Sequence, residues 1–214
     1  MKKISSLVII SIFLFVVIFA TQTSIEALEV SMGDLSLYTG LSYNTFNLEG
    51  EPWAAEIEED LDAEDNSAMG LFLGAKQWFQ EDRLGQIAVG AEFEKLDETE
   101  LVHENTSANI STRGFLLTGT YDLAKFIATR PVDLYASAAA GIYRSDFELA
   151  HDQRLIVEET YTGPGAKVGL QLNYSLEENL AIGSRAHYRY AQPHSEGDLD
   201  YNGFELGGQI ELSF

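Results

Sequence analysis

The feature that most narrows the possible folds of this chain is an alternation of apolar and polar residues with a period of two. The last twelve residues read GFELGGQIELSF, and the apolar positions among them are Phe204, Leu206, Ile210, Leu212 and Phe214. Alternation of this kind predicts a strand with one apolar and one polar face. Chain termini usually fray, so an ordered strand at this position needs a neighbouring strand to pair with.

The same pattern recurs along most of the chain. It is clearest in segments 35–46, 67–79, 84–95, 165–174 and 180–190, and it has less contrast in Ile110–Leu123 and Val132–Phe147. With Tyr201–Phe214, the number of predicted strands is eight. Short connections near 80–83, 124–131 and 175–179 alternate with long polar ones near 49–66, 97–109, 148–159 and 191–200. An even number of strands with short turns on one side and long loops on the other is typical of bacterial outer-membrane barrels.

A soluble barrel would bury the apolar face and present the polar face to water. The polar face here carries many glycines, which would leave a packed core underfilled, and it also carries charged residues. Charges can lie inside a narrow barrel if they pair, while apolar residues face lipid. Backbone groups in lipid must all be hydrogen-bonded, so the last strand must pair with the first. The predicted fold is an all-β, eight-stranded antiparallel transmembrane β-barrel.

The first 27 residues are interpreted as a cleaved secretory signal peptide. Lys2 and Lys3 precede an uncharged run of 14 residues, Leu7–Ala20, which is too short to span a membrane as a helix. Cleavage after Ala20 and cleavage after Ala27 both fit the sequence, and an uncleaved anchor is the alternative. The barrel domain is then 28–214, and its expected location is the bacterial outer membrane.

Composition excludes several classes of function. The chain contains no cysteine, which removes thiol nucleophiles, thiolate metal sites and c-type haem attachment. Without Lys2, Lys3 and Glu26 there remain 11 basic and 33 acidic residues. A chain this acidic lacks the basic footprint of a nucleic-acid-binding protein. No nucleic-acid partner and no cofactor are expected.

The last two predicted strands carry a family resemblance. They read NYSLEENLAIGSRAHYRY and DLDYNGFELGGQIELSF, and they resemble the closing hairpin of the small OmpA/OmpX-like outer membrane protein β-barrel domain family. Phe214, with Leu212 two residues before it, is similar to the signal read by the barrel-assembly machinery. Gln209 stands where that family commonly has a glycine. The resemblance implies the fold, whereas the family hosts several functions.

Charged residues on the polar face form the first candidate site. Arg185, His187 and Arg189 share one face of the seventh predicted strand, and Glu205, Gln209 and Glu211 share one face of the eighth. The full predicted interior charge network comprises Glu92, Glu94, Lys167, Arg185, His187, Arg189, Glu205 and Glu211. Opposite charges on adjacent strands are expected to pair, because an unpaired buried charge is costly. We interpret the network as a static plug, with an electrostatic gate as the alternative.

An enzyme that modifies envelope lipid is a further alternative. His187 and Tyr188 resemble the segment of a lipid A deacylase in which a serine stands two residues after the histidine. Arg189 occupies that position here, so the nucleophile is missing. Consecutive residues such as His194, Ser195 and Glu196 cannot form a triad by adjacency alone. The chain is therefore expected not to be an enzyme.

Acidic segments raise the question of cation binding. Segment 49–66 contains nine acidic residues and no basic one, and 198–203 matches the start of a calcium loop but has Gln209 at the position of the bidentate glutamate. The candidate ligands are Asp60, Asp62, Glu64, Asp198 and Asp200. We interpret these segments as solvated acidic loops, with divalent bridging to lipid headgroups as the alternative. Trp53 is interpreted as an interface anchor.

The expected function is structural or interactive: envelope integrity, surface display, or adhesion through the acidic loops. A narrow channel for ions or small apolar molecules is the second hypothesis, and a lipid-modifying enzyme is the third. Expected partners are outer-membrane lipid, the barrel-assembly machinery and periplasmic chaperones during biogenesis, and divalent cations at the acidic loops.

Overall fold

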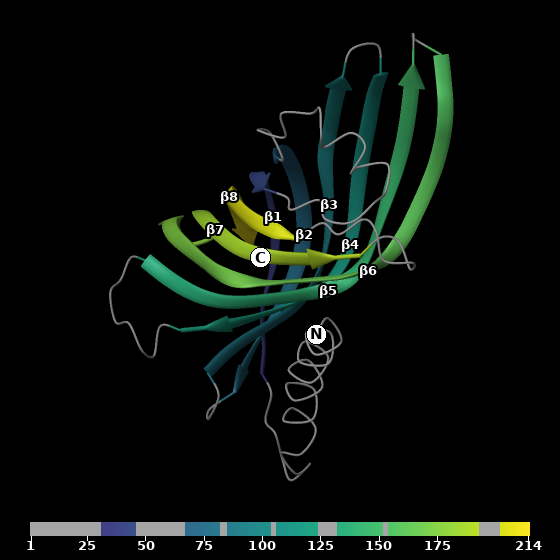
Figure 1. The fold of residues 1–214 in the computed structure, drawn as a ribbon. Coiled ribbons are helices and arrows are strands. Elements are labelled where there is room, and N and C mark those ends of the chain that lie inside the picture. Colours follow the sequence, from purple (N-terminus) through teal and green to yellow (C-terminus); the bar gives the residue numbers. More distant parts are fainter. Residues whose placement is uncertain are drawn as a thin grey trace. The chain divides into compact units, whose positions relative to one another are not determined.

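The computed structural model describes residues 31–45, 67–81, 85–103, 106–123, 132–151, 154–192 and 202–214. These residues form eight strands that are joined as antiparallel neighbours in chain order (Figure 1). The strands are β1 (Ser31–Thr45), β2 (Ser67–Glu81), β3 (Gly85–His103), β4 (Thr106–Asp122), β5 (Val132–His151), β6 (Arg154–Glu177), β7 (Leu180–Ala191) and β8 (Gly203–Ser213). No helix long and apolar enough to cross a membrane occurs in the described ranges.

The sheet closes between its first and last strands. β1 pairs with β8 from Ser36 opposite Ser213 to Asn44 opposite Glu205. Beyond these pairs, the backbone N–H of Phe214 donates to the Leu35 carbonyl at 2.9 Å, and the Leu35 N–H donates to the Phe214 carbonyl at 3.2 Å. The predicted closed, eight-stranded antiparallel barrel is therefore confirmed, and pairing with β1 explains why the chain ends on an ordered strand.

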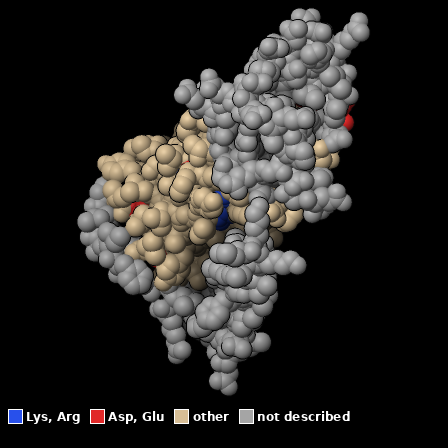
Figure 2. Space-filling model, in the orientation of Figure 1, with Lys and Arg blue, Asp and Glu red and all other residues tan. Residues whose placement is uncertain are grey.

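The barrel places its apolar residues outside and its polar residues inside. On β8, Phe204 and Leu206 are 63% and 58% exposed, whereas Glu205 between them is fully buried. The same alternation holds for β1, where Leu37 and Leu41 are exposed and Ser36 and Ser42 are buried. Figure 2 shows one face of the molecule, on which the described surface carries very few charged residues. Such an apolar wall suits contact with lipid, and it confirms the predicted orientation of the two faces.

One of the short connections predicted from the sequence, near 175–179, lies within the described residues. The β6–β7 hairpin turns through two residues, Glu178 and Asn179, and Gly85 at the start of β3 has a φ of 91°. A positive φ strains residues that have a Cβ atom, so glycine suits this first position of β3.

Two of the four predicted long loops are instead mostly strand. β3 and β4 remain paired as far as His103 and Thr106, and β5 and β6 as far as His151 and Arg154. β2 meets β3 only up to Leu96, and β7 meets β6 only from Gly165 onward. Segments 97–103, 106–112, 144–151 and 154–163 thus form a four-stranded sheet beyond the barrel wall, called the extension below. Residues beyond the wall have no lipid face, so their sequence need not alternate, and alternation alone could not identify them as strands. The other two predicted loops, 49–66 and most of 191–200, lie outside the described residues.

Candidate functional site

The barrel interior contains a charge-balanced set of ionisable side chains. The structure places all eight residues of the interior network expected from the sequence inside the barrel, with Glu211 apart from the other seven, and it adds Lys76. Four carboxylates and four cations are buried there, together with His187; they are Glu92, Glu94, Glu205, Glu211, Lys76, Lys167, Arg185 and Arg189. The whole chain has a formal net charge of −21. The excess of negative charge therefore lies elsewhere in the chain.

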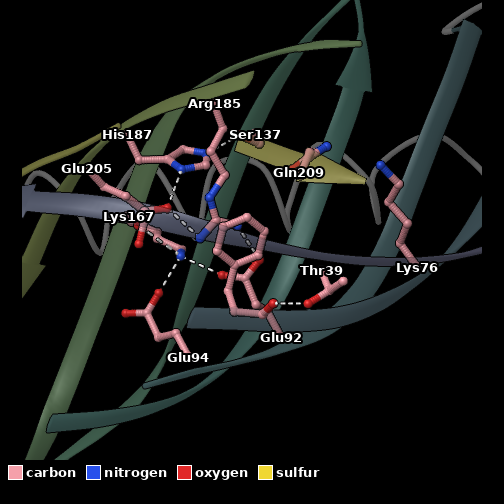
Figure 3. A network of polar contacts seen from close by, with 12 residues as sticks. Thr39, Lys76, Glu92, Glu94, Ser137, Lys167, Arg185, His187, Glu205 and Gln209 are labelled. Atoms are coloured by element: carbon pink, nitrogen blue, oxygen red, sulfur yellow. Dashed lines mark hydrogen bonds and ion pairs between the residues drawn. The ribbon is translucent and has the colours of Figure 1, made fainter. Parts of the chain in front are cut away.

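Lys167 is the centre of the larger part of this network (Figure 3). From β6, its Nζ donates to Glu92 Oε1 at 2.5 Å and to Glu94 Oε2 at 2.6 Å, both on β3, and to Glu205 Oε2 on β8 at 3.2 Å. β3 and β8 are not neighbours of β6 in the sheet. These ion pairs therefore cross the lumen, and they add to the predicted pairing between adjacent strands, which is present between Arg185 and Arg189 on β7 and Glu205 on β8.

Two arginines from β7 complete this group. Arg185 Nη1 donates to Glu92 Oε2 at 2.8 Å, its Nη2 pairs with Glu205, and its guanidinium lies 3.1 Å from the centre of the Phe72 ring. Arg189 Nη2 lies 3.1 Å from Glu94 Oε1 and 2.9 Å from Glu205 Oε2. Together with Lys167 and His187, these residues form what we call the central cluster. Breaking a buried pair leaves an uncompensated charge and costs about 3–5 kcal/mol, so the cluster is expected to be rigid.

A second, smaller group lies nearer the short turns. Lys76 Nζ donates to Glu211 Oε2 at 2.9 Å, and Asn173 Nδ2 donates to the same oxygen at 2.9 Å. The ammonium also lies 4.9 Å from the Trp78 ring, and 5.4 and 5.6 Å from the rings of Tyr38 and Tyr135. Carboxylate and aromatic faces both stabilise a cation that has left water. Lys76 stands on the face of β2 that alternation assigns to the interior, so a signal for it was present in the sequence.

Glycines on facing strands make room for the large interior side chains. Gly74 lies opposite Tyr38 in the β1–β2 register, and a Cβ atom on Gly74 would lie 2.3 Å from the Tyr38 ring. Likewise, a Cβ atom on Gly165 would lie 2.3 Å from the ring of Tyr143, which is fully buried. The glycines of the polar face therefore allow aromatic rings to fill the lumen.

The cavities of the described barrel show how little space remains inside it. Between the central cluster and Lys76 there is a cavity of about 10 Å³, bordered by Tyr38, Ser137 and His187 among others. That volume holds a single water molecule at most. A cavity of about 390 Å³ opens at the short-turn end, where Trp78, Tyr135 and Glu211 form part of its lining. We call it the vestibule, and the Lys76–Glu211 pair stands at its inner end.

Ser137, His187 and Glu205 have the arrangement of a nucleophile, a base and an orienting carboxylate. Ser137 Oγ on β5 lies 2.6 Å from His187 Nε2, and His187 Nδ1 lies 3.5 Å from Glu205 Oε1. Sequence reasoning missed Ser137, because 50 residues separate it from His187 and its segment has little contrast. The cavity that borders both residues is only about 10 Å³, so an acyl substrate has no space to reach Ser137. Glu205 is also held by two arginines and a lysine.

The remaining candidates from the sequence are placed as follows. Leu212 and Phe214, the expected assembly signal, are exposed at the end of β8. The candidate cation ligands Asp60, Asp62, Glu64, Asp198 and Asp200 lie outside the described residues, as do Trp53 and His194. Among the residues that are described, no group of three or more histidine or acidic side chains could hold a metal ion.

Comparisons with known proteins identify the fold. No family model and no curated protein matches the sequence. Among solved structures, neisserial surface protein A is 14% identical with a TM-score of 0.53, over 86% of this chain and 99% of that one. Ail, the attachment invasion locus protein of Yersinia pestis, is 13% identical with a TM-score of 0.52, over 85% of this chain and 100% of its own. Ail in complex with the heparin analogue sucrose octasulfate has 15% identity and a TM-score of 0.50, with the same coverage. These likenesses confirm the fold of a small outer-membrane barrel, as the resemblance of the closing hairpin implied.

Proposed function

We propose that this chain is a bacterial outer-membrane barrel with a structural or surface-interaction role, and that it neither conducts nor catalyses. The observation that carries the proposal is the charge-balanced interior, in which four carboxylates and four cations fill the lumen. The cavity beside the central cluster has a volume of only about 10 Å³. Eight-stranded barrels have interiors just wide enough to be filled by side chains. A filled, neutral lumen suits a protein that acts through its surface.

The extension supports the surface-interaction part of this proposal. Four strands continue past the ends of β7 and β8, and they offer a paired sheet on one side of the barrel. A fold neighbour, Ail, is named for attachment and invasion, which is in line with adhesion. The acidic segment 49–66 adds nine negative charges to the sequence; we propose a solvated surface loop there, and divalent cations that bridge it to anionic headgroups are the alternative. Lipid, the barrel-assembly machinery and periplasmic chaperones are the other proposed partners.

The second candidate function is a narrow channel. It is favoured by the vestibule, a cavity of about 390 Å³ that ends at Lys76 and Glu211. Conductance in planar bilayers separates the two functions. With the mature chain reconstituted, we expect no conductance steps in symmetric salt. Stable unitary steps from the folded wild-type protein would instead establish the channel.

Deletion of surface elements tests the interaction role. One variant lacks 49–66. The other lacks Thr99–His103 and Thr106–Ile110, which face each other in the hairpin and can be removed without shifting its register. Both variants should still show faster migration of unboiled protein on SDS gels, because the barrel wall is intact. Loss of adhesion, or of detergent resistance, in cells that carry either variant supports the proposal. Full retention of both properties by both variants contradicts it.

A further inference from the structure

The described basic residues of the outer wall are gathered in one place. Seven lysine or arginine side chains are described, and four of them lie in the interior. The other three, Lys95, Arg113 and Arg144, are exposed and lie on β3, β4 and β5. Lys95 pairs with Arg113, and Arg113 pairs with Arg144, so the three form a single cross-strand row. We call it the basic row. Like charges directly opposite each other on a sheet repel, so such a row favours a bound anion.

The basic row borders the part of the wall that faces lipid. The next row toward the wall lies two residues earlier on β3 and β5 and two residues later on β4, and it consists of Phe93, Phe115 and Ile142. Phe115 and Ile142 are 58% and 55% exposed, and the rings of Phe93 and Phe115 are 5.0 Å apart. Two residues span about 7 Å along a strand. The basic row thus lies one short step beyond an aromatic edge of the apolar wall, at the level where lipid headgroups meet such barrels.

The side of the row away from the membrane is the extension. Arg144 pairs with Thr162 on β6. β6 pairs with β7 only from Gly165 onward, so Thr162 lies outside the closed wall. The row therefore marks the transition from the closed wall to the extension.

One carboxylate neutralises part of the row. Asp146 Oδ1 accepts from Arg144 Nε at 3.2 Å, and Asp146 Oδ2 lies 3.9 Å from Arg113 Nη2. The Thr160 hydroxyl donates to Asp146 at 2.8 Å, and this hydrogen bond, together with Arg144, holds the pKa of Asp146 below its ordinary value. Asp146 is consequently ionised at neutral pH. Lys95 has no carboxylate partner among the described residues, so the row keeps a local excess of positive charge.

Two further carboxylates lie farther out. Glu148 and Glu158 face each other across β5 and β6, two residues beyond Asp146 on β5, and both are exposed. They lie on the side of the row away from the apolar wall. The order along the strands is therefore apolar, basic, then acidic, and an anion that approaches from the membrane meets the basic row first.

We propose that the basic row binds the phosphate groups of anionic lipids in the outer leaflet, since in such barrels the end opposite the short turns faces the cell exterior. Neighbouring strands are about 4.8 Å apart, so the three cations span about 10 Å, and their long side chains can converge on one headgroup. Guanidinium groups bind phosphate oxygens in a bidentate manner, and a lysine adds a point charge. The acyl chains of the same lipid would lie against Phe93, Phe115 and Ile142. Apolar and cationic contacts side by side fit a phospholipid or a lipid A molecule better than a free anion.

The test compares lipid binding by the folded, mature chain and by two triple variants. Diphosphoryl lipid A is titrated into the protein in neutral detergent, and bound lipid is counted by native mass spectrometry. One variant carries Lys95→Gln, Arg113→Gln and Arg144→Gln. The matched control carries Arg83→Gln, Lys125→Gln and Arg130→Gln, which remove the same charge from the β2–β3 and β4–β5 connections. Each cation near an anionic lipid surface is worth about 5-fold in binding, so the first variant should bind on the order of 100-fold more weakly. The control should bind as the wild type does.

Two further measurements distinguish binding of the phosphate headgroup from other causes of lipid binding. Asp146→Asn removes the carboxylate that contacts both arginines, and it should tighten binding of lipid A about 5-fold. Phosphatidylcholine should bind the wild type and the first triple variant alike. Equal loss in both triple variants would show that only the total charge matters, and it would overturn the proposal. Competition by millimolar inorganic phosphate as strong as that by lipid A would also overturn it, because the site would then be one for free anions.

Discussion

Lys167 on β6 and Glu92 on β3 lie 2.5 Å apart, Nζ to Oε1, although three steps in the strand order of the sheet separate their strands. The pair spans the lumen, and so do the pair of Arg185 with Glu92 and the contact of Lys167 with Glu94. Each of these bonds joins opposite walls. The interior therefore stabilises the closed barrel in addition to the hydrogen bonds between neighbouring strands, and it does so with charges that have no water to replace their partners.

Removal of the central cation should be strongly destabilising. Lys167→Met leaves three carboxylates facing two arginines, and we expect it to lower the free energy of unfolding by about 3–5 kcal/mol. Urea titration of the protein in lipid vesicles, followed by tryptophan fluorescence, measures this change.

The double variant of Lys167→Met with Glu94→Gln is the matched control for that prediction. Because it restores the balance of charge, it should cost less than the sum of the two single variants. Additive costs would show that the two side chains, 2.6 Å apart, are not energetically coupled.

The Lys76–Glu211 pair should not be the only barrier in the lumen. Changing both residues to alanine keeps the interior neutral and extends the vestibule inward. The central cluster remains, since Lys76 contributes no ion pair to it. We therefore expect the Lys76→Ala/Glu211→Ala variant to remain closed in planar bilayers. Unitary conductance from this folded variant would show that the pair alone blocks the lumen, and it would favour the channel hypothesis.

Most of the fold could be predicted from the alternation of apolar and polar residues. It identified all eight strands and their lipid-facing residues, because a barrel in lipid must have one apolar and one polar face along the whole membrane-spanning wall. It failed in 97–109 and 148–159, where the chain leaves the wall. These two segments form strands because the β3–β4 and β5–β6 hairpins stay paired beyond the wall, as far as His103 with Thr106 and His151 with Arg154. That pairing depends on long-range register, which local sequence does not contain.

The sequence predicts which residues face the interior, but it does not predict which of their side chains are in contact. Alternation identifies which side chains point inward, and it assigns Lys76 to the interior as well. It does not say which of them meet across the lumen. The contact of Lys167 with Glu94 depends on how the barrel closes, and the contact of Ser137 with His187 depends on the register of β5, β6 and β7. Neither contact can therefore be predicted from the local sequence, because both depend on the three-dimensional arrangement of the strands.

Glycines that face the lumen should not tolerate a methyl group where a neighbouring backbone is close. A Cβ atom on Gly169 would lie 1.9 Å from the carbonyl oxygen of Ala186 and 2.6 Å from the Cα of His187. Gly169→Ala should therefore lower the free energy of unfolding by about 1–3 kcal/mol.

Gly119→Ala and Gly208→Ala are controls, because a Cβ atom there would lie 4.0 Å from the nearest backbone oxygen. Both should leave stability within about 0.5 kcal/mol of the wild type in the same urea titration. Equal losses at all three positions would point to a general intolerance of alanine in these strands.

The hydroxyl of Thr160 should set the ionisation of Asp146 in the extension. It donates to Asp146 Oδ1 at 2.8 Å, and it is the main reason that the pKa of Asp146 lies below its ordinary value. A lowered folded-state pKa means that Asp146 stabilises the fold above its unfolded-state pKa, and that this contribution is lost as pH falls through the folded-state pKa. Thr160→Val removes the donor and should raise the pKa of Asp146, whereas Thr160→Ser retains a hydroxyl and should raise it less. Titration of the Asp146 side-chain carboxyl carbon by NMR in detergent micelles measures both shifts. An unchanged pKa in the valine variant would show that Arg144, whose Nε lies 3.2 Å from the same oxygen, is sufficient to keep the carboxylate ionised.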